Sequence, residues 1–154
     1  MARAEWYAEG LRFECTLCGN CCSGPPGYVL VTDEEAAAIA ARLGLSVAAF
    51  LREYTRQTPQ GRSLNERQTE AGMDCVFLDR STVAGKAVCS LYEERPLQCR
   101  TFPWWPENLR DRRGWERLGR MCEGVNRGPT VPIVEIRVQR DAQRAATGDG
   151  GPSR

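Results

Sequence analysis

The sequence predicts a small single domain of the α+β class, with short helices and a small β-hairpin or sheet organised around a cysteine-ligated metal site. Three observations predict it: two segments with helical spacing of apolar residues, several short β-prone runs bounded by Gly and Pro, and eight cysteines in 154 residues. A chain of this length can bury the core of one domain. We expect a single metal-binding domain over residues 1–146 and a disordered tail over residues 147–154.

Two short helices are predicted in succession. Thr32 and Glu35 have the spacing of a capping box, and Gly44 stands where a glycine commonly ends a helix. Ser46 can cap the second helix. The apolar residues with helical spacing are Ala36, Ile39, Ala40 and Leu43 in the first helix and Val47, Phe50, Leu51 and Tyr54 in the second.

Short strands are expected on both sides of the middle of the chain. Residues 28–31 are β-prone, and one further strand is possible around residues 63–68. Residues 75–78 and 87–92 resemble the two strands of a hairpin. Beyond them, Pro96 suits the first turn of a short helix that carries Cys99.

The segment from residue 130 to about residue 146 has two interpretations. Its valines fit a helix that begins near Pro132, and they also fit a strand with alternating burial. We favour a helix for the later half and leave the first half open.

The cysteines carry the strongest functional signal. Four of them lie within eight residues, in the spacing C-x2-C-x2-C-C, and the chain has no histidine, so a soft metal would have to be bound by sulfur. No secretory signal is recognisable, so we expect a cytoplasmic protein with reduced thiols, which are metal ligands rather than four disulfides. The predicted metal ligands are Cys15, Cys18, Cys21, Cys22, Cys75, Cys89, Cys99 and Cys122.

The loop of four cysteines limits how a metal can be held. A C-x2-C turn places two sulfurs on one ion, and Gly19 supplies the backbone freedom that such turns use. The first three cysteines have the spacing of a bacterial ferredoxin, but Cys22 is adjacent to Cys21 and no Cys-Pro follows. Because adjacent side chains diverge in most backbone conformations, we expect Cys21 and Cys22 not to share one small ion.

Cys99 lies between two arginines. If it occupies the first turns of a helix, the helix dipole lowers its pKa. Arg95 and Arg100 would then offset the charge of the thiolate and donate hydrogen bonds to sulfur, which makes them the predicted cofactor-binding residues. The alternative is that both arginines form surface ion pairs with Glu93 and Glu94.

An aromatic segment follows, and it is rich in arginine. Trp104, Trp105 and Trp115 could stack on a single-stranded nucleic acid. Acidic residues lie among the arginines and the net charge is only +1, so we do not expect nucleic-acid binding, and no segment suits a membrane. We interpret residues 102–106 as a rigid aromatic lid near Cys99.

The order of these motifs resembles the YkgJ-type cysteine-cluster family, the CxxCxxCC zinc- or iron-chelating domain. The resemblance implies metal chelation. A similar cysteine cluster occurs in flagellin lysine methylases, but no AdoMet-binding glycine loop is present here, so we do not transfer that activity. The matching residues are Phe13, Cys15, Cys18, Gly19, Cys21, Cys22, Cys75, Phe77, Leu78, Cys89, Tyr92, Arg95, Pro96, Cys99, Arg100, Phe102 and Pro103.

The favoured interpretation is a protein that binds an iron–sulfur centre, of the 4Fe–4S type, and has a redox, electron-transfer or accessory role toward a protein partner. One alternative is a structural or interaction module stabilised by zinc. Another is a metal-dependent protein-modifying enzyme; the chain lacks a histidine base and a phosphate-binding glycine loop, so its chemistry would have to lie at the metal or at a thiol. Disulfides or redox-active thiols are the remaining interpretation.

Overall fold

The computed structural model describes residues 4–24 and 27–147, and these form two compact units. Unit 1 comprises residues 4–18 and 101–147, and unit 2 comprises residues 19–24 and 27–100. Both units combine helices with small antiparallel sheets, so the predicted α+β class is confirmed. A single domain over residues 1–146 stays a prediction. Of the expected tail, Thr147 ends a helix, and residues 148–154 lie outside the described residues.

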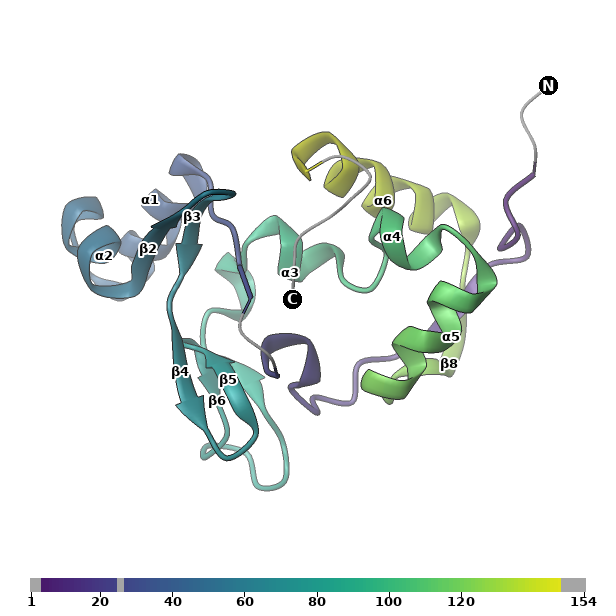
Figure 1. Ribbon diagram of the computed structural model, residues 1–154, viewed down its shortest axis with the longest axis horizontal. Helices are drawn as coiled ribbons and strands as arrows, with labels where there is room; N and C mark the ends of the chain where they lie inside the picture. Colours follow the sequence, from purple (N-terminus) through teal and green to yellow (C-terminus); the bar gives the residue numbers. More distant parts are fainter. Residues whose placement is uncertain (1–3, 25–26, 148–154) are drawn as a thin grey trace. The chain divides into compact units, whose positions relative to one another are not determined.

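Unit 2 contains the two predicted helices, α1 (Asp33–Leu43) and α2 (Val47–Tyr54) (Figure 1). The capping box is present: the Glu35 amide donates to Thr32 Oγ1 at 3.1 Å, and the Thr32 amide donates to Glu35 Oε1 at 2.9 Å. Gly44 ends α1 in the left-handed conformation, with φ 70°. The Ser46 hydroxyl caps α2 by accepting from the Ala49 amide at 3.1 Å. Local sequence signals therefore predicted both helices correctly.

Three two-stranded antiparallel sheets follow in unit 2. Successive strands pair with one another, so each sheet is a hairpin. In the register of the last two hairpins, Cys75 lies opposite Glu66 and Cys89 lies opposite Leu78. The pairs are β2 (Thr55–Thr58) with β3 (Gly61–Leu64), β4 (Glu66–Thr69) with β5 (Gly72–Cys75), and β6 (Leu78–Asp79) with β7 (Val88–Cys89).

Three strand predictions need correction. Residues 28–31 form only an isolated bridge between Leu30 and Ser63, because the backbone of this segment bonds to the adjoining residues of β3 at single points. The strand expected around residues 63–68 is divided between β3 and β4. The predicted hairpin is shorter than expected, and Cys75 belongs to β5 rather than to the strand before the turn.

The core of unit 2 is mainly aliphatic. Ile39 and Phe50 are fully buried, and Phe50 stacks with Tyr54. Burial of a side chain as large as Phe50 contributes about 2–3 kcal/mol. Cys75 is part of this cluster, and Cys22, Cys89 and Cys99 pack against it as partly buried side chains. Four of the five thiols of unit 2 therefore belong to the hydrophobic core or touch it.

Two short 3₁₀ turns and one short helix complete unit 2. They are η1 (Asn20–Cys22), η2 (Tyr92–Glu94) and α3 (Leu97–Thr101). The Cys99 and Arg100 amides both donate to the Pro96 carbonyl, so the predicted short helix after Pro96 is confirmed. Along the sequence, the chain passes from unit 2 to unit 1 within α3.

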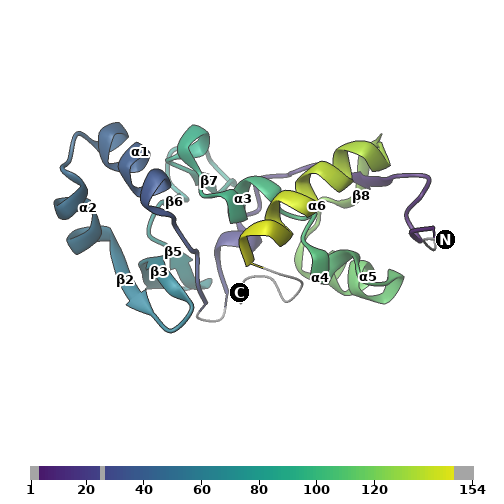
Figure 2. The same cartoon turned by 90° about the horizontal axis from the view of Figure 1, so that it is seen from above.

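Unit 1 joins the start of the chain to its last third. β1 (Leu11–Phe13) pairs antiparallel with β8 (Val125–Val131), with a register shift between Arg12 and Phe13 (Figure 2). The segment left open at residues 130–146 thus contains both elements, because β8 ends at Val131 and α6 begins at Ile133 after Pro132. The helices of unit 1 are α4 (Pro106–Leu109), α5 (Arg112–Met121) and α6 (Ile133–Thr147).

The core of unit 1 is aromatic. Trp104 and Trp115 stack with ring centroids 5.5 Å apart and ring planes 9° apart, and Phe13 contacts Trp104 edge-on. Tyr7 and Ile136 are buried in the same cluster. Cys122, at 6% exposure, lies at this core. In residues 4–24 and 27–147, no helix has both the length and the apolar character needed to cross a membrane.

Candidate metal centre

All eight cysteines lie among the described residues, and none of them forms a disulfide. Unit 1 contains three of them and unit 2 contains five. The three in unit 1 are Cys15, Cys18 and Cys122, and the five in unit 2 are Cys21, Cys22, Cys75, Cys89 and Cys99.

The turn that carries Cys21 and Cys22 depends on Gly19. Gly19 has φ 80° and precedes η1, and its carbonyl accepts from the Cys22 amide at 3.0 Å. A Cβ at this position would lie 2.5 Å from the Cβ of Ala87. Only glycine allows this close approach between the loop and the segment before β7, as the sequence predicted for a tight cysteine loop.

Cys21 and Cys22 do not diverge, in contrast to the expectation from their adjacency. Their Sγ atoms are 3.8 Å apart, within the 3₁₀ turn η1. A tetrahedral ion with metal–sulfur bonds of about 2.3 Å has sulfur–sulfur edges of about 3.8 Å. The observed separation is therefore compatible with both thiolates on one ion.

A buried ion pair holds this loop against β5. Asp74 has no exposed side-chain surface and accepts from Ser23 Oγ at 2.5 Å and from Arg80 Nε at 2.7 Å. The Arg80 guanidinium is the largest of the causes that keep the pKa of Asp74 below its ordinary value. The Met73 amide also donates to the Gly24 carbonyl at 2.8 Å. These contacts connect the residue after Cys22 with the residue before Cys75.

The pair Asp74–Arg80 was not predicted from the sequence. Ser23 and Asp74 are 51 positions apart, and neither residue belongs to a recognisable motif. The only signal in the sequence is that Ser23 directly follows Cys22 and Asp74 directly precedes Cys75, and both cysteines are predicted metal ligands.

Four thiols of unit 2 lie around the same apolar cluster. Cys75 is 5% exposed, and Cys22, Cys89 and Cys99 are partly buried against the cluster. Burial raises the pKa of Cys99 well above its ordinary value, and the charges of the three other thiols raise it further. The prediction that the helix dipole lowers this pKa is wrong, because α3 has only five residues and desolvation outweighs it.

The two arginines near Cys99 have different surroundings. Arg95 lies over the Tyr92 ring at 4.1 Å, and its charge lowers the pKa of both Cys89 and Cys99 against the larger effect of burial. Arg100 donates to the Arg95 carbonyl at 2.9 Å and lies 3.8 Å from Glu35. The alternative ion pairs with Glu93 and Glu94 are not the ones observed, since Glu94 pairs with Arg42 at 3.6 Å. A cofactor-binding role of Arg95 and Arg100 stays a prediction.

In unit 1, the cysteine loop and the segment after α5 run side by side. The Glu14 amide donates to the Gly124 carbonyl at 3.1 Å, and Thr16 Oγ1 donates to Glu123 Oε1 at 2.5 Å. A Cβ on Gly124 would lie 2.3 Å from the Glu14 carbonyl oxygen, so this contact requires glycine. The contacts place the residues before and after Cys15 against those that follow Cys122.

The sulfur of Cys15 accepts a backbone hydrogen bond, since the Leu17 amide donates to Cys15 Sγ at 3.4 Å. Such an N–H···S bond stabilises a thiolate and orients it as a metal ligand. Burial raises the pKa of Cys89 and of Cys122, while the backbone amides of Leu91 and Gly124 lower these pKa values to a smaller extent.

The donor set fits a thiophilic metal, although the thiols are not yet in coordinating positions. Thiolates without histidine suit zinc or iron. Within residues 4–24 and 27–147, no three His, Cys, Asp or Glu side chains are placed so that they could hold an ion together as they stand. Binding therefore requires the thiols within a group to move closer together.

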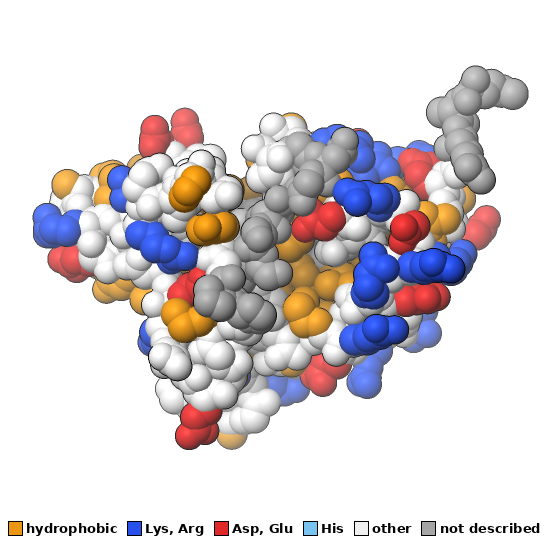
Figure 3. All heavy atoms as spheres, viewed as in Figure 1, with side chains coloured by type: hydrophobic (Ala, Val, Ile, Leu, Met, Phe, Trp, Pro, Cys, Tyr) orange, Lys and Arg blue, Asp and Glu red, His pale blue; other side chains and the backbone are white. Residues whose placement is uncertain are grey.

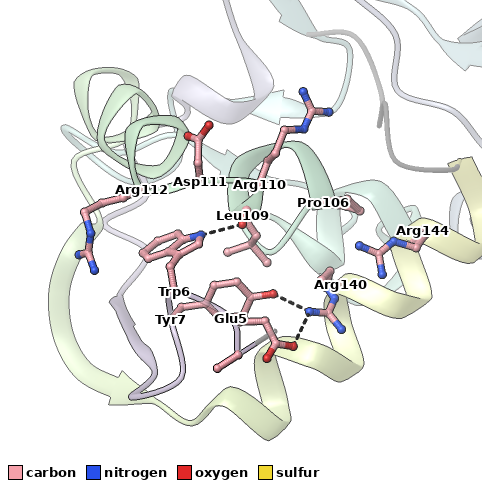
Figure 4. Close-up of a pocket in the computed structure, with 11 residues that line it drawn as sticks. Glu5, Trp6, Tyr7, Pro106, Leu109, Arg110, Asp111, Arg112, Arg140 and Arg144 are labelled. Atoms are coloured by element: carbon pink, nitrogen blue, oxygen red, sulfur yellow. Dashed lines mark hydrogen bonds and ion pairs between the residues drawn. The ribbon is translucent and has the colours of Figure 1, made fainter. Parts of the chain in front are cut away.

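A separate pocket of about 800 Å³ lies in unit 1 between the N-terminal segment, α4 and α6 (Figure 4). Its charges largely satisfy one another. Arg140 donates to Tyr7 Oη and lies 3.3 Å from Glu5 Oε1, and the neighbouring arginines keep the pKa of Glu5 low, at about 2. Arg112 lies over the Trp6 ring. None of the eight cysteines lines this pocket, so it is not part of the metal centre.

The tryptophans of the aromatic segment are structural. Trp104 and Trp105 are each 7% exposed and Trp115 is 2% exposed, so none of them offers a ring face to a nucleotide base. Basic side chains with acidic ones among them cover the exposed surface around α4 and α5 (Figure 3). The absence of nucleic-acid binding stays a prediction, as does the proposed lid near Cys99.

Comparison with known proteins supports the metal-binding interpretation. The family described as "putative zinc- or iron-chelating domain", CxxCxxCC, matches residues 14–123. The chain is 34% identical over 98 residues to an uncharacterised protein of Methanocaldococcus jannaschii, an alignment that covers 64% of this chain and 48% of that protein. The chain thus spans about half the length of the curated relative it matches. No solved structure matches. From the match over residues 14–123, this chain belongs to the CxxCxxCC family of zinc- or iron-chelating domains.

Proposed function

We propose that the chain binds an iron–sulfur centre through the thiolates of unit 2 and uses it for electron transfer, for redox sensing or to assist a protein partner. The observation that carries the proposal is the gathering of Cys22, Cys75, Cys89 and Cys99 around one apolar cluster. A cluster is held by four cysteine thiolates, and its potential is tuned by burial and by hydrogen bonds to sulfur.

The surroundings of these thiols support a bound cation. Four thiolates in an apolar environment repel one another and are poorly solvated, and a metal centre removes both costs. Arg95 supplies a further positive charge toward Cys89 and Cys99. The Leu91 backbone amide lowers the pKa of Cys89 against the larger effect of burial. A reducing compartment such as the cytoplasm would keep the ligands available.

Anaerobic purification followed by absorbance spectroscopy and analysis of iron, zinc and sulfide on the same sample tests the proposal. We expect iron and sulfide together with a broad thiolate-to-iron absorption near 400 nm. A colourless protein with stoichiometric zinc would replace the cluster with a zinc site. A protein without either metal would contradict thiolate chelation itself.

One observation favours zinc as the second candidate. The 3.8 Å separation of the Cys21 and Cys22 sulfurs matches the edge of a mononuclear tetrahedral thiolate site. In that case the metal would stabilise unit 2 as an interaction module. The same elemental analysis distinguishes the two candidates, and a protein-modifying activity would then need its own assay.

A further inference from the structure

We propose that the pocket of unit 1 binds a small phosphate monoester with an aromatic group, whose phosphate is held by Arg110 and Arg112. The pocket lies wholly within unit 1, because all of its lining residues fall within residues 4–7, 106–112 and 140–144. No cysteine is among them, so this inference goes beyond the proposed function and does not depend on a bound metal.

The apolar part of the lining is already ordered. Tyr7 and Leu109 are each 4% exposed and belong to the core of unit 1, and Trp6 packs against that core as a partly buried side chain. The Trp6 indole donates to the Leu109 carbonyl at 2.8 Å, which fixes the ring against α4. The volume of about 800 Å³ is that of a small-molecule site, which combines an apolar lining with a few fixed polar groups.

The charged side chains on the α6 side of the pocket are paired with one another. Arg140 lies 3.3 Å from Glu5 and 2.8 Å from Asp141. Its guanidinium also donates to Tyr7 Oη, and Arg144 lies 3.4 Å from Asp141. These contacts make this wall rigid and leave little positive charge on it for a ligand.

Arg110 and Arg112, at the other side, have no such pairing. Among residues 4–24 and 27–147, neither guanidinium lies within ion-pair distance of a carboxylate. Asp111 lies between them in the sequence and caps α5 by accepting from the Gly114 amide at 2.7 Å, so the two arginines exceed it by one charge. Arg112 lies over the Trp6 ring, 5.1 Å from its centroid, and this contact leaves the in-plane N–H groups of the guanidinium available.

Two guanidinium groups beside aromatic side chains suit a phosphate better than a carboxylate. One arginine satisfies both oxygens and the single charge of a carboxylate, whereas a phosphate monoester has three acceptor oxygens and close to two negative charges. Figure 4 shows Trp6, Tyr7 and Leu109 together, with the labelled arginines around them. The aromatic group of the ligand can therefore cover the apolar lining while its phosphate contacts Arg110 and Arg112, both of which are exposed.

Isothermal titration calorimetry of the full-length protein with phenyl phosphate tests this assignment. We expect phenyl phosphate to bind about tenfold more tightly than inorganic phosphate, which lacks the aromatic group, and than benzoate, which lacks the third oxygen and the second charge. Arg110→Ala and Arg112→Ala should each weaken the binding of phenyl phosphate about tenfold. The matched control is Arg113→Ala, which removes the same charge from an exposed position of α5 that does not line the pocket, and it should change the affinity less than about twofold.

Each other result overturns the assignment. Absence of phenyl phosphate binding, or binding that Arg110→Ala and Arg112→Ala leave unchanged, would show that the pocket is not the site. An equal loss of affinity in Arg113→Ala would reduce the effect to the general charge of the surface. Benzoate binding as tight as that of phenyl phosphate would replace the phosphate with a carboxylate, and inorganic phosphate binding as tightly would remove the role of the apolar lining. Far-UV circular dichroism verifies the fold of each variant.

Discussion

Units 1 and 2 place their cysteines differently with respect to their cores. In unit 2, Cys75 is a core residue and three further thiols pack against the same aliphatic cluster. In unit 1, the core is built from tryptophans and other aromatic residues, with Cys122 at this core and Cys15 exposed.

This difference implies different roles for a bound metal. Where four thiols surround a core, the metal replaces the repulsion among buried sulfurs with bonds, so metal binding and folding are coupled. Where a single thiol, Cys122, belongs to an otherwise aromatic and aliphatic core, a metal adds to a structure that already exists. The two units should therefore respond differently to loss of a bound metal.

Removal of the bound metal should reveal the largest difference in stability between the two units. We expect a chelator to unfold unit 2, since the coupling of thiolate binding to folding is on the order of 10 kcal/mol, and to leave unit 1 folded. All four tryptophans belong to unit 1, so their emission should change little while far-UV circular dichroism falls. Hydrogen exchange should show lost protection in α1, α2 and β2–β7, with protection kept in the elements of unit 1. Equal loss of protection in β8 and α6 would contradict the comparison.

A cavity in the core of unit 2 should act on that unit alone. Phe50→Ala removes a fully buried ring and should lower the free energy of unfolding of unit 2 by about 3–5 kcal/mol. Val47→Ala, on the same helix at 42% exposure, is the control and should change stability by less than about 0.5 kcal/mol. Denaturant unfolding followed by circular dichroism and by tryptophan emission measures both units. A matching shift in the tryptophan transition would argue against separate cores.

The ion pair under the cysteine loop should matter for both stability and metal retention. Asp74→Asn leaves the loop without its charged acceptor and should cost about 2–3 kcal/mol, since Arg80 is partly solvated. Because Ser23 follows Cys22 directly, we also expect faster metal loss to a chelator. The control is Glu70→Gln, an exposed substitution in the turn between β4 and β5. Unchanged metal-release rates in Asp74→Asn would show that the pair does not position the thiols.

The partly buried carboxyl group of Glu107 should make the stability of unit 1 depend on pH. Glu107 Oε2 is buried without a hydrogen-bond partner among the described residues, and burial raises the pKa of Glu107 from 4.5 to about 7. The folded state therefore binds the carboxyl proton of Glu107 more tightly than the unfolded state does. The stability that this proton contributes to the folded state is fully present below pH 4.5 and is lost as pH rises through about 7.

The Glu107→Gln substitution tests this pH dependence of stability. Glu107→Gln should match the wild type near pH 4.5 and should be more stable by about 1–2 kcal/mol near pH 8.5, after allowance for partial solvation. Denaturation midpoints from tryptophan emission at the two pH values give the difference, with the exposed Glu116→Gln as control. Parallel pH profiles for wild type and Glu107→Gln would refute the raised pKa.

What could be predicted from the sequence was mostly local. The capping box at Thr32 and Glu35, the glycine at residue 44 and the short helix after Pro96 involve neighbouring residues, and all three are confirmed. The fold class followed from the helical spacing of apolar residues and the short β-prone runs together with the cysteine content, and the family followed from the spacing of the cysteines and their flanking residues.

What could not be predicted depends on long-range contacts. The contact between Ser23 and Asp74 joins a loop to a strand 51 positions away, and no local pattern encodes it. The raised pKa of Cys99 depends on burial by a cluster that forms only in the folded chain. The close approach of the Cys21 and Cys22 sulfurs occurs in a turn that follows Gly19, where a Cβ would collide with the distant residue Ala87.

X-ray absorption at the edge of the bound metal tests the central claim, that cysteine thiolates alone supply the protein's ligands. We predict a first shell dominated by sulfur at about 2.3 Å. A first shell made mainly of oxygen or nitrogen would contradict the claim, because the chain has no histidine and the ion would then be held elsewhere than at the thiols.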